Sequence, residues 1–87
     1  MSDTAQLTAE ATVYSTTWCP DCHRAKAFLK SRGVDYREID IEKTPDAATV
    51  VAEHNAGKHV VPTFEVGGKF YGNPSIAQLK ELFPAAG

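Results

Sequence analysis

Cysteine is scarce in this chain of 87 residues: it occurs twice, and both copies lie in one short segment. Small secreted domains held together by disulfides have more cysteines spread along the chain, so that class of protein is excluded. Long apolar runs are also missing, which argues against a membrane-spanning helix. Residues 1–6 have neither the basic start nor the apolar core of a secretory signal peptide. We therefore expect a cytoplasmic protein that does not associate with a membrane.

Clusters of basic residues are missing as well. The 9 lysine and arginine residues are outnumbered by 11 acidic ones, the net charge is −2, and no basic patch is interleaved with aromatic residues. Nucleic-acid-binding proteins normally carry such a patch, so nucleic acid is not an expected partner. The hydrophobic content of 43% suffices for one small core. We predict a flexible lead-in over 1–10 and a single domain over 11–87 that acts as a monomer.

Hydrophobic periodicity predicts four strands and three helices along the chain. The expected strands cover 11–15, 34–41, 60–66 and 69–71, and the expected helices cover 20–32, 45–54 and 74–83. A strand, a helix and a second strand in succession form a right-handed unit with parallel strands. The complete order, β-α-β-α-β-β-α, predicts an α/β protein of the thioredoxin-like type. Its sheet would be mixed and four-stranded, with helices on both faces.

Local residues mark the ends of these elements. Thr44 precedes Pro45, and Asn73 precedes Pro74, so both are predicted as helix N-caps followed by proline in the first helical position. Gly67–Gly68 is a strong signal for a tight turn between the last two strands.

The two cysteines lie in Thr17–His23, which ends the first strand and opens the first helix. Pro20 suits the first position of a helix, because its missing N–H would have no partner there. This places Cys19 at or beside the N-cap, where unpaired N–H groups and the positive end of the helix dipole stabilise a thiolate. Cys22 lies one turn further along, where it can close a disulfide but is poorly placed for attack from outside. We interpret Cys19 as the nucleophile and Cys22 as the resolving thiol.

A Cys-x-x-Cys segment can also be half of a zinc site or a structural disulfide. Zinc needs about four ligands, but no second pair of cysteines exists, and His23, His54 and His59 are poorly spaced to complete the set. A disulfide across so short a loop adds little stability through chain entropy. Redox chemistry is therefore the preferred interpretation, and we expect no metal site.

Asp21, between the two cysteines, suits the helix dipole, but its charge opposes thiolate formation at Cys19. His23 or Lys26 could partly offset that charge, although Lys26 is expected to point into solvent. Cys19 is therefore predicted to be activated less than in a motif with a neutral residue at position 21.

Two segments resemble the glutaredoxin family. Trp18–Cys22, preceded by Val13–Ser15, is similar to the glutaredoxin active site, and Val60–Phe64 resembles that family's Thr-Val-Pro segment. The order and spacing match over 11–83. Within the family, the chain resembles the mycoredoxins, which share a threonine-rich lead into Trp-Cys and an Asn-Pro-Ser before the last helix, here Asn73–Ser75.

The resemblance implies a reaction and a set of site residues. Cys19 would attack a mixed disulfide between a protein and a low-molecular-weight thiol. Pro62 would follow a cis peptide bond and face Cys19, and the backbone of Val61 would pair with the bound thiol. Lys58 would meet a substrate carboxylate or lie in a solvated loop, and Trp18 would form a wall of the site or pack in the core. The expected thiol-binding residues are Thr17, Trp18, Pro20, Lys58, Val61, Pro62, Asn73 and Ser75.

Three positions depart from the usual glutaredoxin pattern. Glutaredoxins typically have lysine where this chain has Thr16, tyrosine where it has Asp21, and Gly-Gly-x-Asp where it has Gly72–Ser75. The last difference removes the carboxylate that holds the γ-glutamyl group of glutathione, although Asn73 or Ser75 could hold an anion or serve simply as a cap. The expected co-substrate is mycothiol, bacillithiol or glutathione, with no tightly bound cofactor. Because of Asp21, we expect a more reducing disulfide than in a typical glutaredoxin.

The main functional hypothesis is a thiol–disulfide oxidoreductase that acts on S-thiolated or disulfide-containing proteins. A second hypothesis is a thioredoxin-like electron donor to ribonucleotide reductase, recycled by a flavoprotein reductase. Such donors usually have a Trp/Phe-Arg-Pro stretch before the last helix, which Tyr71–Pro74 lacks. Two further hypotheses are a non-catalytic module that binds a metal or a partner protein, and a redox sensor in which Cys19 and Cys22 join in response to oxidant.

Overall fold

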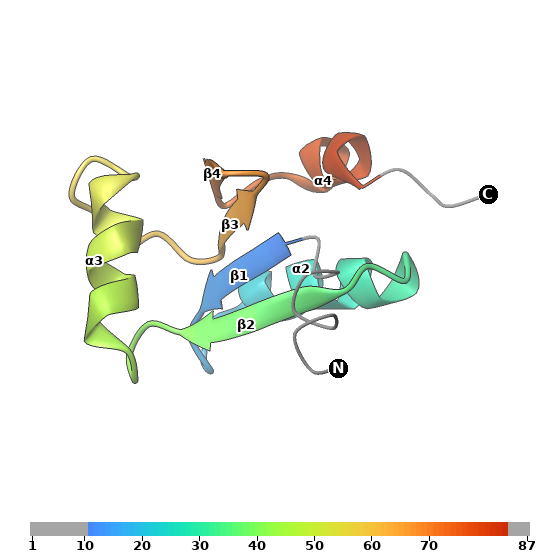
Figure 1. Ribbon diagram of the computed structural model, residues 1–87. Coiled ribbons are helices and arrows are strands. Elements are labelled where there is room, and N and C mark those ends of the chain that lie inside the picture. Colours follow the sequence, from blue (N-terminus) through green and yellow to red (C-terminus); the bar gives the residue numbers. More distant parts are fainter. Residues whose placement is uncertain (1–10, 84–87) are drawn as a thin grey trace, which may run out of the picture.

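The computed structural model describes residues 11–83, so the predicted lead-in over 1–10 and the last residues of the predicted domain lie outside the described residues. The element order and the predicted fold class are confirmed within that range (Figure 1). The strands are β1 (Ala11–Ser15), β2 (Tyr36–Asp40), β3 (Thr63–Val66) and β4 (Lys69–Gly72). The helices are α2 (Pro20–Ser31), α3 (Pro45–Glu53) and α4 (Ile76–Leu82).

The strands form one mixed sheet in the order β2-β1-β3-β4. β1 runs parallel to β2 and antiparallel to β3, and β4 returns antiparallel to β3 through the predicted turn at Gly67 and Gly68, which both have positive φ. The parallel pair is connected through α2, as parallel strands require a crossover. β1 is therefore a central strand, and its carboxyl end leads directly into the segment with the two cysteines.

Helices pack on both faces of this sheet (Figure 1). On one face, Val13 and Phe64 pack against α2 and α4; the buried members of this cluster are Ala11, Val13, Ala25, Leu29, Phe64, Leu79 and Phe83. On the other face, Ile41 packs with Ala47 and Val51 of α3. Burial from both sides holds the start of α2 next to the end of β1.

Two strands are shorter than predicted. The strand expected over 34–41 spans Tyr36–Asp40, and the strand expected over 60–66 begins at Thr63. The residues before Thr63 make a different contact: the carbonyl oxygen of Pro62 accepts a hydrogen bond from the N–H of Asn73 at 2.7 Å. This bond ties the start of β3 to the segment before α4, directly after the register pair of Thr63 with Gly72.

The last helix begins later than predicted. Its N-cap is Ser75, whose hydroxyl oxygen accepts a hydrogen bond from the N–H of Gln78 at 3.1 Å. Asn73, the predicted cap, has a φ of 45° and donates its N–H to Pro62 instead. Asparagine and serine are both good N-caps, so local sequence permits either start. The long-range contact to Pro62 selects the later one.

Lys26 does not point into solvent, and that prediction was wrong. Its Nζ donates a hydrogen bond to Oε2 of Glu38 on β2 at 2.6 Å, and its side chain is only 17% exposed. The same carboxylate oxygen accepts a hydrogen bond from the hydroxyl of Ser15 on β1 at 2.8 Å. The periodicity of α2 alone could not reveal this contact, because both partners belong to the sheet.

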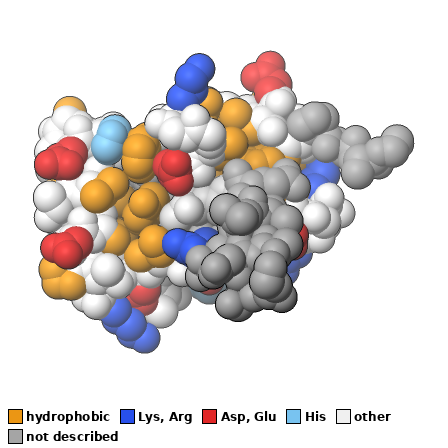
Figure 2. Space-filling view, viewed as in Figure 1, with side chains coloured by type: hydrophobic (Ala, Val, Ile, Leu, Met, Phe, Trp, Pro, Cys, Tyr) orange, Lys and Arg blue, Asp and Glu red, His pale blue; other side chains and the backbone are white. Residues whose placement is uncertain are grey.

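Figure 2 shows hydrophobic side chains gathered beside α3, with acidic and basic side chains interspersed around them on the face in view. This gathering lies where the core cluster between α3 and the sheet reaches the surface.

Over residues 11–83, no helix is both long enough and apolar enough to cross a membrane. Over the same range, no three histidine, cysteine or acidic side chains are grouped so as to hold a metal ion.

Candidate active site

Cys19 is the N-cap of α2, where the position of Pro20 predicts it. Its backbone is extended, with φ −85° and ψ 113°, and Pro20 takes the first helical position. Its Sγ accepts a hydrogen bond from the N–H of Cys22 at 3.0 Å, in the role that a serine or aspartate oxygen plays in other N-caps. The N–H donor and the positive end of the helix both stabilise negative charge on this sulfur. The local backbone therefore prepares Cys19 to react as a thiolate.

Cys22 is fully buried beneath Cys19. Burial raises the pKa of the Cys22 thiol to about 12, and its hydrogen bond to Cys19 adds to the effect. A backbone hydrogen bond from Thr16 and the positive charge of Lys26 act in the opposite direction. Cys22 therefore rests as a neutral thiol. Cys19 is also buried, with 4% of its surface exposed.

The segment before β3 faces Cys19 through Val61. The Val61–Pro62 peptide bond is cis, as the family resemblance implies, and the thiol of Cys19 donates toward the carbonyl oxygen of Val61 at 3.8 Å. Thr63 supports this segment by donating its hydroxyl to the carbonyl oxygen of Val60 at 2.7 Å. The side-chain amide of Asn55 donates to the Thr63 hydroxyl at 3.3 Å and to the carbonyl oxygen of Val51 at 2.7 Å. The sequence marked Asn55 only as the end of a helix.

A hollow of about 330 Å³ lies beside Trp18; the lining residues of this Trp18 hollow are Thr16, Trp18, Ile41, Glu42, Ala48, His59 and Val61. Trp18 is 64% exposed, so it forms a wall of the site and does not pack in the core. Its indole N–H donates to Oε2 of Glu42 at 3.0 Å, which fixes the ring. Glu42 and His59 were not predicted as site residues, because both lie in loops whose approach to Trp18 depends on the fold.

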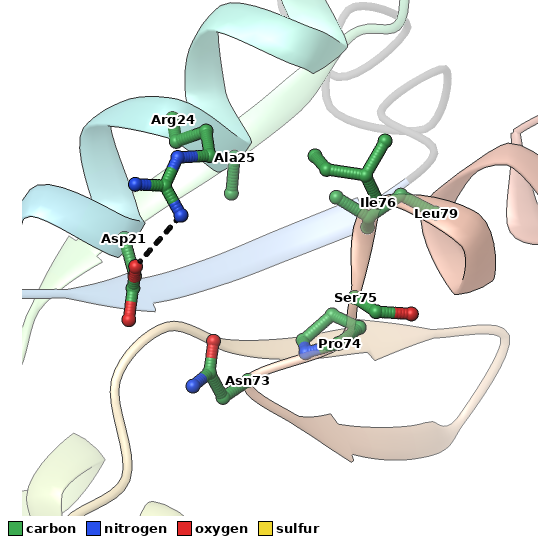
Figure 3. Close-up of a pocket in the computed structure, with 8 residues that line it drawn as sticks. All are labelled: Asp21, Arg24, Ala25, Asn73, Pro74, Ser75, Ile76 and Leu79. Atoms are coloured by element: carbon green, nitrogen blue, oxygen red, sulfur yellow. Dashed lines mark hydrogen bonds and ion pairs between the residues drawn. The ribbon is translucent and has the colours of Figure 1, made fainter.

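A second hollow, of about 350 Å³, lies between the first turn of α2 and the start of α4 (Figure 3). Asp21 and Arg24 come from α2 and Asn73 and Ser75 from the segment before α4; Ala25, Pro74, Ile76 and Leu79 complete the lining. Nη1 of Arg24 pairs with Oδ1 of Asp21 at 3.1 Å. The carboxylate between the two cysteines thus has an exposed ion-pair partner in Arg24, a residue that the sequence did not single out.

The remaining predicted site residues lie at the edges. Thr17 and Pro20 are exposed beside Cys19, and the carbonyl oxygen of Thr17 lies 3.1 Å from Nε2 of His23, which holds that ring against the loop. Lys58 is exposed in the loop after α3 and lines neither hollow. The structure therefore brings Trp18, Cys19, Val61 and Pro62 together and leaves Lys58 outside this group.

Comparison with known proteins agrees with this geometry. A family model described as Glutaredoxin matches residues 11–71. The chain belongs to the glutaredoxin family. Glutaredoxins are thiol–disulfide oxidoreductases that act with low-molecular-weight thiols and protein disulfides, and Cys19 and Cys22 occupy the active-site position of the family.

Two curated relatives cover most of the chain. A Mycobacterium tuberculosis protein assigned to the glutaredoxins is 39% identical over 75 residues, which cover 85% of this chain and 89% of the relative. Mycoredoxin 1 of Corynebacterium glutamicum is 33% identical over 73 residues, which cover 82% of this chain and 89% of the relative. The likeness to both glutaredoxins and mycoredoxins that the two motifs indicate is therefore confirmed.

Two solved structures share the glutaredoxin fold with this chain. A glutaredoxin from Archaeoglobus fulgidus superposes with a TM-score of 0.75 at 31% identity, covering 93% of this chain and 92% of that one. The glutaredoxin-like NrdH-redoxin of Escherichia coli is described as having a thioredoxin-like activity profile. It superposes with a TM-score of 0.69 at 27% identity, covering 87% of this chain and 97% of that one.

Proposed function

We propose that this protein reduces mixed disulfides between proteins and a low-molecular-weight thiol, with Cys19 as nucleophile and Cys22 as resolving thiol. The observation that carries the proposal is the asymmetry of the pair. Cys19 is the N-cap of α2, faces the carbonyl group of Val61, and accepts the N–H of Cys22 at its Sγ, while Cys22 is fully buried with its pKa raised to about 12. The two hollows are lined by residues next to Cys19 in space or sequence: Trp18 and Val61 line the first hollow, and Asp21 lines the second.

The proposed reaction is a sequence of thiol–disulfide exchanges. The Cys19 thiolate attacks the sulfur of the small thiol in the mixed disulfide. The protein substrate leaves as a thiolate and takes up a proton, so that it is reduced and Cys19 becomes S-thiolated. A second small thiol then attacks the sulfur of the bound small thiol, which releases Cys19 as a thiolate and forms a disulfide of the two small thiols. Alternatively, Cys22 attacks Sγ of Cys19, which closes the Cys19–Cys22 disulfide and releases the small thiol.

Among mycothiol, bacillithiol and glutathione, the lining of the Trp18 hollow favours mycothiol. The hollow has no lysine or arginine in its lining, and it includes the carboxylate of Glu42. Glutathione and bacillithiol present carboxylates away from their thiols, and a like charge at Glu42 would repel them. Mycothiol presents uncharged hydroxylated rings, which suit an exposed indole face and hydrogen-bonding groups such as Thr16 and His59.

The first experiment measures adduct formation by intact mass. Reduced Cys22→Ser protein is mixed with the symmetrical disulfide of each of the three thiols in turn, so that Cys19 takes up one half of the disulfide and releases the other half as free thiol. Reduction of a mixed-disulfide substrate by each thiol is followed in parallel. We expect an adduct on Cys19 and matching turnover with mycothiol above the other two. The Cys19→Ser variant is the matched control and should form no adduct. Failure of all three thiols to form an adduct on Cys19 would contradict the proposal.

The choice of thiol has its own test at Glu42. Glutamine in the Glu42→Gln variant keeps an oxygen that can accept from the Trp18 indole but removes the negative charge. We expect kcat/KM with glutathione to rise a few-fold at low ionic strength, because its carboxylates are no longer repelled by the charge of Glu42. We expect kcat/KM with mycothiol to stay unchanged, because mycothiol carries no carboxylate. Equal effects on both thiols would mean that Glu42 does not discriminate between them.

The likeness to NrdH-redoxin supports a second candidate, an electron donor to ribonucleotide reductase that is recycled by a flavoprotein reductase. Turnover with a thioredoxin-reductase-type flavoprotein, without any small thiol, would establish this function instead.

The cytoplasmic location, the monomeric state and the single domain over 11–87 stay predictions. Cell fractionation, light scattering and a single unfolding transition would test them.

A further inference from the structure

Lys26 lies one helical turn beyond Cys22 on α2. Residues four apart share one face of a helix, with Cβ atoms about 5–6 Å apart, so Lys26 stands on the face that buries Cys22. Its side chain is 17% exposed, whereas lysine side chains are normally solvated. The fold therefore brings a cation in from solvent, close to a buried thiol.

The sheet holds this cation in place. Nζ of Lys26 donates to Oε2 of Glu38 at 2.6 Å, and the same oxygen accepts the hydroxyl of Ser15 at 2.8 Å. Ser15 is 1% exposed and is followed by Thr16, whose backbone hydrogen bond reaches Cys22. These contacts run from β1 through β2 to α2, and they confine a side chain that would otherwise be mobile.

The state of Cys22 changes during the proposed reaction. In the reduced protein, a hydrogen bond to Cys19 helps to hold the proton on Cys22. When Cys19 is part of a mixed disulfide, its sulfur bears no negative charge, and this hold on the proton weakens. The positive charge of Lys26 and the backbone of Thr16 are the two influences that favour the Cys22 thiolate. Both remain in place when Cys19 is S-thiolated.

We propose that Lys26 is a positioning residue for the resolving step, in which its ammonium group stabilises Cys22 as it attacks Cys19. Glu38 holds this ammonium group, and the Ser15 hydroxyl donates to the same Glu38 oxygen. This inference rests on the proposed function, because a resolving step requires a mixed disulfide on Cys19. The Cys22 thiolate attacks Sγ of Cys19, the bond from Cys19 to the bound sulfur breaks, and a bond between the two cysteines forms. The electron pair leaves with the bound thiol, which is reduced, and the proton of Cys22 passes to water.

Several other charged or titratable groups surround this pair. On α2, Cys19 acts on Cys22, and on β2, Tyr36 and Glu38 act on Lys26. Glu38 is itself influenced by Lys30. Because Lys26 forms an ion pair with Glu38, the test must separate loss of the cation from loss of the pair.

Stopped-flow reaction with dithiobis-nitrobenzoate separates the two steps on the complete chain. The first release of nitrothiobenzoate reports attack by Cys19 and depends on reagent concentration. The second reports resolution by Cys22 and does not. We expect Lys26→Met to slow the second release by about threefold to tenfold. A rise of about one unit in the pKa of Cys22 lowers its thiolate fraction about tenfold, and the higher nucleophilicity of the more basic thiolate recovers part of this loss. The pH profile of the second release should move to higher pH in this variant. The rate of the first release should stay within twofold of its rate in the original protein.

Three variants are matched controls. Lys26→Arg keeps the charge and should restore the second release to within twofold. Lys30→Met removes an exposed cation from the same helix and should leave both releases unchanged. Glu38→Gln removes the negative charge but keeps an amide oxygen that can accept from Lys26, so the cation stays in place and the second release should be at least as fast as in the original protein. Thermal unfolding of each variant shows whether it is folded under the conditions of the assay.

Two outcomes would overturn the inference. One is a second release in Lys26→Met with unchanged rate and pH profile, and the other is equal slowing in Glu38→Gln, which would assign the effect to the structure of the ion pair. Neither outcome bears on whether Cys19 forms adducts with biological thiols, so failure of this inference is distinct from failure of the proposed function.

Discussion

At the scale of single residues, the two cysteines differ in their contacts, although both are buried and they are only three residues apart. Sγ of Cys19 accepts a hydrogen bond from the N–H of Cys22 and lies near the carbonyl oxygen of Val61. Burial and the hydrogen bond to Cys19 disfavour charge on the Cys22 sulfur. Folding therefore changes the titration of Cys22.

We predict that the reduced protein loses stability in alkaline solution because of Cys22. The pKa of this thiol is raised from 9.0 to about 12 by folding, so the stabilisation is fully present below pH 9 and is lost as the pH rises toward 12. In that window the unfolded chain releases a proton that the folded chain keeps, and the slope approaches about 1.4 kcal/mol per pH unit.

Chemical denaturation of the reduced protein at a series of pH values measures this slope. The Cys22→Ser variant lacks the titrating thiol, so its stability should fall less steeply between pH 9 and 12. Lysine and tyrosine titrations are common to both proteins and cancel in the comparison. Parallel curves for the two proteins would contradict the prediction.

At the scale of elements, the starts of the helices differ in how their caps are made. Ser75 accepts a hydrogen bond from the N–H of Gln78 at 3.1 Å, while Thr44 stands in the N-cap position of α3 without a side-chain capping bond. α4 contributes Leu79 to the core and the residues before it to the second hollow. The cap of α4 therefore supports both the core and the site.

We predict that Ser75→Ala lowers the free energy of unfolding by about 1 kcal/mol, the usual cost of losing an N-cap side chain. Thr44→Ala is the matched control and should cost only a few tenths of that, because no capping bond is lost. Urea unfolding followed by circular dichroism measures both changes. Equal losses in the two variants would show that the α4 cap is not the source of the difference.

At the scale of the whole molecule, one contact group joins α2 to two strands. Lys26 on α2, Glu38 on β2 and Ser15 on β1 meet at a single carboxylate oxygen. The hydrogen bond from Lys26 is the main cause that lowers the pKa of Glu38 below its ordinary value of 4.5. The charged form of this carboxylate therefore contributes to the stability of the folded state.

We predict that this group contributes to acid sensitivity. A lowered pKa stabilises the folded state above about pH 4.5, and this contribution is lost as the pH falls through the lower folded-state value. Glu38→Gln should reduce stability at neutral pH by up to about 1 kcal/mol, the range for a partly exposed pair, and should flatten the acid dependence. Glu81→Gln, at an exposed position on α4, is the control and should change neither the stability at neutral pH nor its acid dependence. Denaturation at pH 3–7 measures both variants.

Much of the fold and the centre of the site could be predicted, because their signals are local. The element order follows from apolar periodicity, and the position of Cys19 follows from Pro20 at the start of a helix. The errors occurred where two local signals compete or where a partner is distant. Asn73 and Ser75 are both good caps, and the contact of Asn73 with Pro62 decided between them. Lys26 has the spacing of a surface residue on its helix, but its partner lies on the sheet.

By itself, the sequence determined the family, the order of strands and helices, and the position of the two cysteines at the start of a helix, since each depends on residues within a few positions of one another. Only the tertiary structure decided that Val61 faces Cys19 and that Glu42 accepts from the Trp18 indole. It also decided that Lys26 is paired with Glu38 on the sheet. These contacts join segments far apart in the chain, and their geometry exists only when the sheet has brought those segments together.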